Sequence, residues 1–297
     1  MLEHMNPVPS NPARVVVLGA GGFVGSASVG RLERGGIEVL GLARTDLDLL
    51  HEGASTRLAA ELRSDDALLV ISAKAPVKDN AMLLDNIRMV KTVCDALEES
   101  AVLHVVYISS DAVYADSSEP IEEGFFTAPE SLHGAMHLAR ELMLTNSYTG
   151  PLAILRPTLI YGLRDPHNGY GPNRFRRLAA AGEDIVLFGE GEERRDHVLV
   201  DDVAELVYLS LVHRSRGVLN VATGQVISFR DIAERVVSFF DRPVPIEGTP
   251  RQGPMPHNGY RPFDAAATLT AFPHFGYTVV DEGLAKTHQQ MSEDDDG

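Results

Sequence analysis

Two histidines four residues apart, His133 and His137, are the side chains of this sequence best suited to proton transfer. Residues 132–146 are expected to form a helix, and side chains at positions i and i+4 lie on the same helix face, so both imidazoles can face one cleft. An imidazole has an unperturbed pKa of about 6.5 and exchanges a proton near neutrality without assistance. Ser110 and Asp111 follow the predicted strand at residues 102–109, at the edge where open parallel sheets bind ligands. These four residues are the catalytic candidates.

A glycine-rich loop near the start of the chain predicts a nucleotide site. Residues 14–18 form an aliphatic run typical of a buried parallel strand, and residues 26–34 are expected to be helical. Between them, Gly19, Gly22 and Gly25 permit a tight turn, the approach of backbone N–H groups to a pyrophosphate, and close packing of helix on strand. Phe23 and Val24 lie inside this loop and are expected to contact the same cofactor. A glycine-rich turn without a ligand is the alternative.

The end of the second predicted strand, residues 37–42, bears on the choice of dinucleotide. An Asp or Glu there would bind both ribose hydroxyls of NAD, whereas this chain offers Arg44. Arg44 can pair with a 2′-phosphate, which favours NADP, while a solvated arginine beside an NAD site is the alternative. Asp48 is expected near the adenine, and Ala73, which ends the predicted strand 67–73, is a further candidate for the NAD(P) site.

Alternating strands and helices predict the fold that would hold these residues. The pattern is that of an α/β protein with a doubly wound parallel sheet, or Rossmann fold. We expect the dinucleotide-binding domain at residues 14–162, rejoined by about residues 198–224. Residues 163–197 and 225–290 interrupt this pattern and are assigned to a smaller, discontinuous C-terminal lobe. Residues 1–13 and 291–297, the latter with an acidic run, are expected to be disordered.

Composition excludes several classes of protein. The chain has 297 residues, 44% of them apolar, and a formal net charge of -16, which argues against binding to nucleic acid. No apolar run approaches the roughly 20 residues of a membrane span, so no membrane association is expected. Cys94 is the only cysteine, which suits a reducing cytoplasm. No Cys/His cluster has the spacing of a metal site, so no metal is expected.

Several motifs resemble those of the extended short-chain dehydrogenases, the NAD-dependent epimerase/dehydratase family. Residues 109–114, SSDAVY, are similar to the family's S-[ST]-x-x-V-Y signature. Residues 155–162, LRPTLIYG, resemble its L-R-P-x-x-x-Y-G strand, and residues 195–202, RDHVLVDD, its R-D-[FYH]-x-x-V-x-D segment. The matches occur in order from about residue 14 to residue 280. The resemblance implies the Rossmann fold with a substrate lobe that closes over a nucleotide-linked sugar.

The departure from this family lies at the catalytic motif. Family members carry Y-x-x-x-K there, whereas this chain keeps Gly134 and Glu141 in register and has His133 and His137 in the reactive positions. The resemblance implies that His133 replaces the tyrosine as acid/base, that His137 binds the nicotinamide ribose, and that Ser110 bonds the substrate oxygen. Asp111 matches the aspartate that dehydratases use as an acid, but the glutamate that follows it in those enzymes is Ala112 here, which argues against dehydration.

The same resemblance assigns the substrate side. Arg195, Asn173 and a later arginine, either Arg251 or Arg261, would hold the diphosphate of a nucleotide sugar; ion pairs of Arg195 with Asp196 or Asp202, and of Arg261 with Asp264, are the alternatives. The implied function is an NAD(P)-dependent oxidoreductase or epimerase acting on such a sugar. A catalytically decayed cofactor-binding sensor or assembly protein is the alternative. The family's dimers imply a homodimer through helices 80–100 and 132–146.

Overall fold

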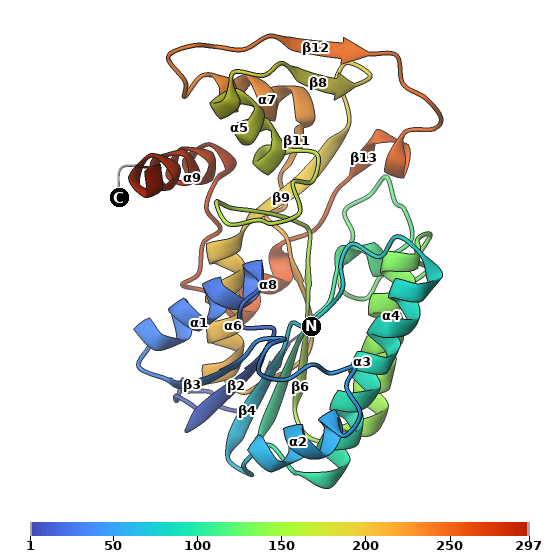
Figure 1. Cartoon of the computed structure of the whole chain (residues 1–297), viewed down its shortest axis with the longest axis vertical. Coiled ribbons are helices and arrows are strands. Elements are labelled where there is room, and N and C mark those ends of the chain that lie inside the picture. Colours follow the sequence, from blue (N-terminus) through green and yellow to red (C-terminus); the bar gives the residue numbers. More distant parts are fainter. Residues whose placement is uncertain (1, 296–297) are drawn as a thin grey trace.

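The computed structural model describes residues 2–295, and its centre is a seven-stranded sheet (Figure 1). The strands lie in the order β1-β10-β6-β5-β4-β2-β3. All neighbours are parallel except β1, which is antiparallel to β10. The chain therefore has the predicted doubly wound α/β fold. The strands are β1 (Glu3–His4), β2 (Arg14–Leu18), β3 (Glu38–Leu42), β4 (Asp66–Val70), β5 (His104–Ile108), β6 (Leu152–Pro157) and β10 (Ser215–Val221).

Helices cover both faces of the sheet, which explains why its central strands are continuous apolar runs. α1 (Phe23–Arg34), α6 (Val200–Val212) and the short α8 (Ala266–Ala271) pack on one face. α2 (Ala54–Glu61), α3 (Asn80–Glu99) and α4 (Leu132–Ser147) pack on the other. Every residue of β2, β4 and β5 is buried as a result.

The smaller lobe lies above the carboxyl ends of the central strands in Figure 1 and has its own core. One of its sheets joins β7 (Leu159–Tyr161), β9 (Arg194–Leu199), β11 (Val226–Ser228) and β13 (Tyr260–Arg261), and a second pairs β8 (Ile185–Phe188) with β12 (Ile246–Thr249). Three helices pack with these sheets around the core of the lobe: α5 (Pro172–Ala181), α7 (Phe229–Val237) and α9 (Val280–Asp295). β7 pairs with β9 and so belongs to the lobe, although residues 159–161 were expected in the dinucleotide-binding domain.

The prediction of a disordered leader is wrong for residues 3–10. β1 extends the edge of the sheet, and the backbone N–H groups of Asn6 and Ser10 each donate to the end of α6 at 2.9 Å. The His4 ring stacks on His213 with 4.5 Å between centroids, which fixes the leader further. At the other end, residues 291–295 continue α9 rather than ending in a coil. Residues 1, 296 and 297 lie outside the described part of the chain.

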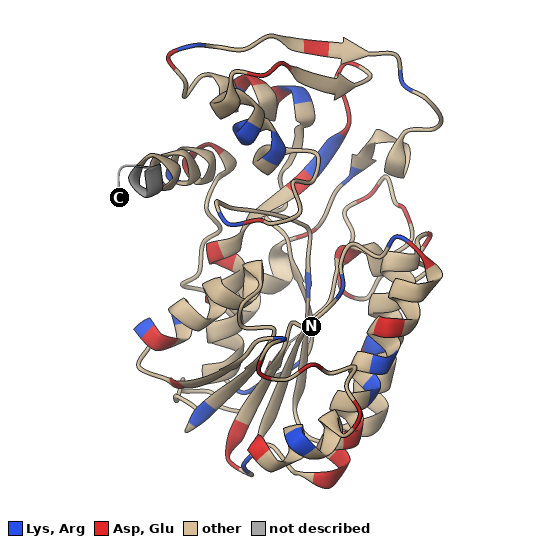
Figure 2. Ribbon diagram, in the orientation of Figure 1, with Lys and Arg blue, Asp and Glu red and all other residues tan. Residues whose placement is uncertain are grey.

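Basic residues of the lobe include several on α5, α7 and β9, which show blue segments in Figure 2. α5 carries Arg174, Arg176 and Arg177, and β9 begins with Arg194 and Arg195. No helix of the described chain is apolar over a length sufficient to span a bilayer.

Candidate active site

A cavity of about 890 Å³ lies between the carboxyl ends of the parallel strands and the small lobe. This is the edge at which ligands bind to doubly wound sheets, and the volume is within the range of small-molecule sites. Its wall brings together the glycine loop, the segment after β5, the start of α4 and part of the lobe. Sequence-predicted residues in this wall are Gly19, Gly22, Phe23, Val24, Arg44, Asp48, Ala73, Ser110, Asp111, His133, His137, Asn173 and Arg195.

The glycine loop has the geometry of an anion cradle. Gly22 caps α1 in an extended conformation without a side-chain hydrogen bond, so the first N–H groups of that helix are free to meet a ligand. Gly19 has a φ of 92°, and a Cβ there would lie 2.8 Å from the Ser72 backbone nitrogen. A Cβ at Gly25 would lie 2.0 Å from the Gly19 carbonyl oxygen. Only glycine allows this approach of helix and strand, as the sequence predicted.

Arg44 and Asp48 lie together at the rim of the cavity. The Arg44 Nε donates to Asp48 Oδ2 at 3.2 Å, and the arginine side chain is 75% exposed. Asp48 also accepts from the Leu50 N–H at 3.0 Å, and this bond, together with Arg44, lowers the pKa of Asp48. Asp48 therefore presents an anion at the rim, while Arg44 is free to leave this exposed pair for a ligand.

The two histidines meet in the cavity wall, one turn apart on α4. Their rings contact edge to face with centroids 4.7 Å apart. Burial lowers the pKa of His133, and the carboxylate of Asp111 opposes that shift. Burial, then His133 and Arg140, lower the pKa of His137 well below its usual value. Both imidazoles are therefore neutral at pH 7. His133 can accept a proton, and its buried Nδ1 has no partner in the described chain.

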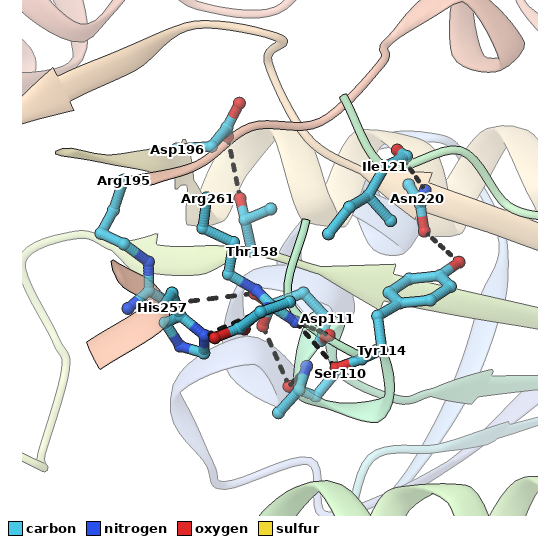
Figure 3. Close-up of polar contacts among 12 residues, drawn as sticks. Ser110, Asp111, Tyr114, Ile121, Thr158, Arg195, Asp196, Asn220, His257 and Arg261 are labelled. Carbon is cyan, nitrogen blue, oxygen red and sulfur yellow. Dashed lines mark hydrogen bonds and ion pairs between the residues drawn. The ribbon is translucent and has the colours of Figure 1, made fainter. Parts of the chain in front are cut away.

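Ser110 and Asp111 follow β5 (Figure 3) and border the same cavity as His133 and His137. Ser110 caps a short 3-10 turn, accepting from the Ala112 N–H at 3.2 Å and donating to Asp111 Oδ1 at 3.3 Å. Asp111 is bound in turn by a guanidinium, because Arg261 Nε lies 3.1 Å from its Oδ2. Asp111 is thus held in place by Arg261 at the end of β5.

Of the predicted phosphate-binding residues, Arg195 and Asn173 border the cavity, whereas Arg251 and Arg261 do not. Arg195 reaches the cavity, and among residues 2–295 its ion pairs are a 3.3 Å contact to Glu193 and a 3.9 Å contact to Asp111. Asn173 also borders it, but its amide is occupied: Oδ1 accepts from the Gly162 N–H at 3.0 Å and Nδ2 donates to Asp165 at 2.9 Å.

Arg261 was predicted to hold a diphosphate oxygen, and the structure assigns its donors elsewhere. It is 1% exposed and donates to Asp116 Oδ1 at 2.6 Å and to the Asp111 carbonyl at 2.8 Å, besides the Asp111 carboxylate (Figure 3). It is not part of the cavity wall, and the alternative partner Asp264 is not used. A buried guanidinium is stabilised by carboxylates, and the two that bind Arg261 come from the loop after β5, 145 and 150 residues away in the chain.

Arg251 lies outside the cavity wall too, beside the Phe188 carbonyl.

Three residues of the site were missed. His197 borders the cavity, and burial lowers its pKa to about 3, so it is neutral. Tyr107 on β5 and Arg140 on α4 lie behind His137. Strand alternation around residues 195–199 could have flagged His197. Nothing in the sequence marked Tyr107, which looks like any core aromatic residue of a buried strand.

Below the histidines, Glu141 holds α4 to the sheet. Arg156 Nη2 donates to Glu141 Oε2 at 2.6 Å and its Nε donates to Oε1 at 2.9 Å, and the Ser109 hydroxyl donates to Oε1 as well. Glu141 therefore has a structural role that does not depend on the identity of the two reactive residues, which is consistent with its presence at the position that the family's motif gives it. Within residues 2–295, no three His, Cys, Asp or Glu side chains form a group that could hold a metal ion.

Comparison with known proteins identifies the family. Residues 15–222 match the model of the NAD dependent epimerase/dehydratase family. The chain belongs to this family. Its fold is also similar to that of the UDP-glucose 4-epimerase of Thermus thermophilus in complex with NAD, with a TM-score of 0.83 and 24% identity over 94% of this chain and 99% of that one.

Two further solved structures share this fold. The UDP-N-acetylglucosamine 4-epimerase of Bacillus cereus has a TM-score of 0.80 and 21% identity, covering 94% of this chain and 96% of its own. MoeE5 in complex with UDP-glucose and NAD has a TM-score of 0.81 and 23% identity, covering 95% and 99%. The similarity extends over the small lobe as well as the sheet, so the chain has the whole architecture of these proteins.

Proposed function

We propose that this protein is an NAD(P)-dependent oxidoreductase or epimerase that acts on a nucleotide-linked sugar and uses His133 as its acid/base. The observation that carries the proposal is that His133, Ser110 and the glycine loop border one cavity. Family membership and the nucleotide-sugar epimerases of the same fold support the substrate class.

The residues present fit a dinucleotide. The free N–H groups at the start of α1 suit a pyrophosphate, and the buried Ser72 hydroxyl, without a partner in residues 2–295, borders the same cavity. Bound nicotinamide would supply the acceptor or donor of a hydride. His137 would bond a ribose hydroxyl, and Arg44 would meet a 2′-phosphate if NADP is used.

His133 would move the proton. Its pKa, lowered by burial, leaves it unprotonated at pH 7, as a base must be before it removes a proton from a sugar hydroxyl. Once it holds that proton, the imidazolium is stabilised by Asp111, whose charge favours the protonated form of His133. Ser110 would bond the same sugar oxygen, and Arg195 would hold the diphosphate.

Two observations favour this enzyme over a decayed scaffold. Met136, which precedes His137 on α4, is fully buried and contacts Arg140 instead of bordering the cavity, so it does not fill the site. His133 itself borders the cavity beside the glycine loop, so its ring can meet a ligand bound there. A homodimer and a cytoplasmic location remain predictions.

The test is nicotinamide absorbance near 340 nm when UDP-glucose or UDP-N-acetylglucosamine is added to protein with NAD or NADP. We expect a transient or lasting change with at least one sugar, and product epimer or keto sugar by chromatography. Cofactor binding without turnover of any nucleotide sugar would favour the decayed sensor.

A further inference from the structure

A buried hydrogen bond joins Tyr107 to His137. Tyr107 projects from β5, is fully buried, and its hydroxyl oxygen lies 2.8 Å from His137 Nδ1. The two rings are tilted by 33° with 6.1 Å between centroids, so the hydroxyl rather than the ring face makes the contact. Such a contact on one nitrogen of an imidazole fixes which nitrogen carries the proton.

Both groups are neutral, so the direction of the bond depends on which tautomer of His137 is present. Burial raises the pKa of Tyr107 far above its usual value, so the phenol keeps its proton. Burial also keeps His137 unprotonated, leaving it one N–H. When the phenol donates to Nδ1, its buried proton has an acceptor and the imidazole proton occupies Nε2. In the opposite tautomer Nδ1 would donate to the phenol oxygen, and the phenol proton would lose this acceptor and depend on the Ser109 side chain beside it.

Arg140 places a positive charge beside this pair. Its side chain is fully buried, its guanidinium lies 5.2 Å from the centre of the Tyr107 ring, and it donates to the Ser72 carbonyl at 2.7 Å and to Asn86 Oδ1 at 3.3 Å. No carboxylate within residues 2–295 makes an ion pair with it; the neighbouring Glu141 is bound to Arg156. This charge disfavours an imidazolium at His137.

We propose that Tyr107 and Arg140 are positioning residues that hold His137 as a neutral imidazole with its proton on Nε2. The ionisable groups facing His137 are then Tyr107 from β5, and His133 and Arg140 from its own helix. The lysine of the family's pattern carries an N–H donor and a positive charge on one side chain. In this chain the two are separate: His137 presents one neutral N–H, and the positive charge lies behind it on Arg140. The use of that N–H for a cofactor ribose rests on the proposed function; the tautomer does not.

The experiment is long-range 15N–1H NMR of the histidine rings, recorded without cofactor or substrate. The wild type should show His137 as the Nε2–H tautomer across pH 6 to 8. Tyr107→Phe removes the donor and should convert a measurable fraction of His137 to Nδ1–H. Tyr148→Phe is the matched control, because that hydroxyl donates to the Val102 carbonyl, and it should leave His137 unchanged.

Arg140 is tested through the titration of the same ring. Arg140→Met should raise the His137 titration midpoint by about one unit, whereas Arg140→Lys should restore the wild-type behaviour. A wild-type His137 protonated on Nδ1, or a tautomer indifferent to Tyr107→Phe, overturns the proposal even if the Arg140 variants do not fold. Because no turnover is measured, an inactive protein would contradict the proposed function and leave this result standing.

Discussion

The rings of His133 and His137 meet edge to face, with their centroids 4.7 Å apart, in the wall of the cavity that also holds the glycine loop. The i, i+4 spacing predicted this shared face. The structure adds the reason why the pair remains uncharged: burial lowers the pKa of both rings, and a proton on either would repel one on the other. The pair can therefore accept one proton at a time, and we expect His133 to be the acceptor because the charge of Asp111 favours its protonated form.

Activity should depend on pH through His133. Its pKa is lowered from 6.5 by burial, and the base acts in its neutral form, so kcat/KM should be constant above about pH 6.5 and fall as the pH decreases through the lowered pKa. A tyrosine base would instead lose activity as the pH falls through a higher range. A pH profile with nicotinamide and the active sugar checks this, and a limb above pH 8 would argue against His133.

Stability should fall in mild acid because of buried neutral histidines. Burial lowers the pKa of His104 to about 4 and that of His197 to about 3, so the unfolded chain binds more protons than the native one below pH 6.5. Stability is then fully present above pH 6.5 and is lost as the pH falls towards these values, by roughly 3 kcal/mol for His104 alone. Urea unfolding at pH 7.5 and 4.5 measures this loss, and His104→Gln should make the pH dependence shallower.

Arg44 should affect one dinucleotide only. Its exposed pair with Asp48 contributes little, so the guanidinium can turn to a 2′-phosphate. Arg44→Ala should weaken NADP binding by about tenfold and change NAD binding little. Calorimetric titration of both cofactors decides this; equal effects on NAD and NADP would mean that Arg44 plays no part in the choice.

The Glu141–Arg156 pair should carry much of the stability of α4. Glu141→Ala leaves Arg156 buried without its carboxylate, and removing one partner of such a pair costs about 3–5 kcal/mol. Arg216→Gln, which breaks an exposed pair with Glu3, is the control and should cost no more than about 1 kcal/mol. Denaturant unfolding of the two variants tests the contrast, and equal losses would refute it.

Patterns of residues close together in the sequence predicted the fold, the glycine loop and the histidine pair of the site. The run at residues 14–18, Gly22 and Gly25 have their effect within one strand, turn and helix, and Gly25 touches Gly19 as expected, although Gly19 itself also meets the Ser72 backbone. The i, i+4 histidines are equally local. What the sequence did not show depends on contacts between distant residues: Arg261 finds Asp111 across 150 residues, and His4 joins the sheet next to Ser215.

Tyr107 illustrates the same limit within the site. In the sequence it is one aromatic residue of a buried strand. The contact of its hydroxyl with His137 becomes visible only when β5 and α4 are placed together. The pairing alternatives considered for Arg195 and Arg261 were likewise neighbours in sequence. Arg261 instead binds Asp111 because the lobe folds over the end of β5, whereas the nearest carboxylate of Arg195 is that of Glu193, with Asp111 at 3.9 Å.

Replacement of His133 tests the central claim most directly. His133→Phe keeps an aromatic ring in the wall and removes the proton acceptor, while His274→Phe changes an exposed histidine outside the cavity. With the nucleotide sugar that the wild type turns over, we predict that His133→Phe lowers kcat by about 10²–10⁴-fold without loss of NAD(P) binding, and that His274→Phe has no effect. Undiminished turnover by His133→Phe would contradict the account.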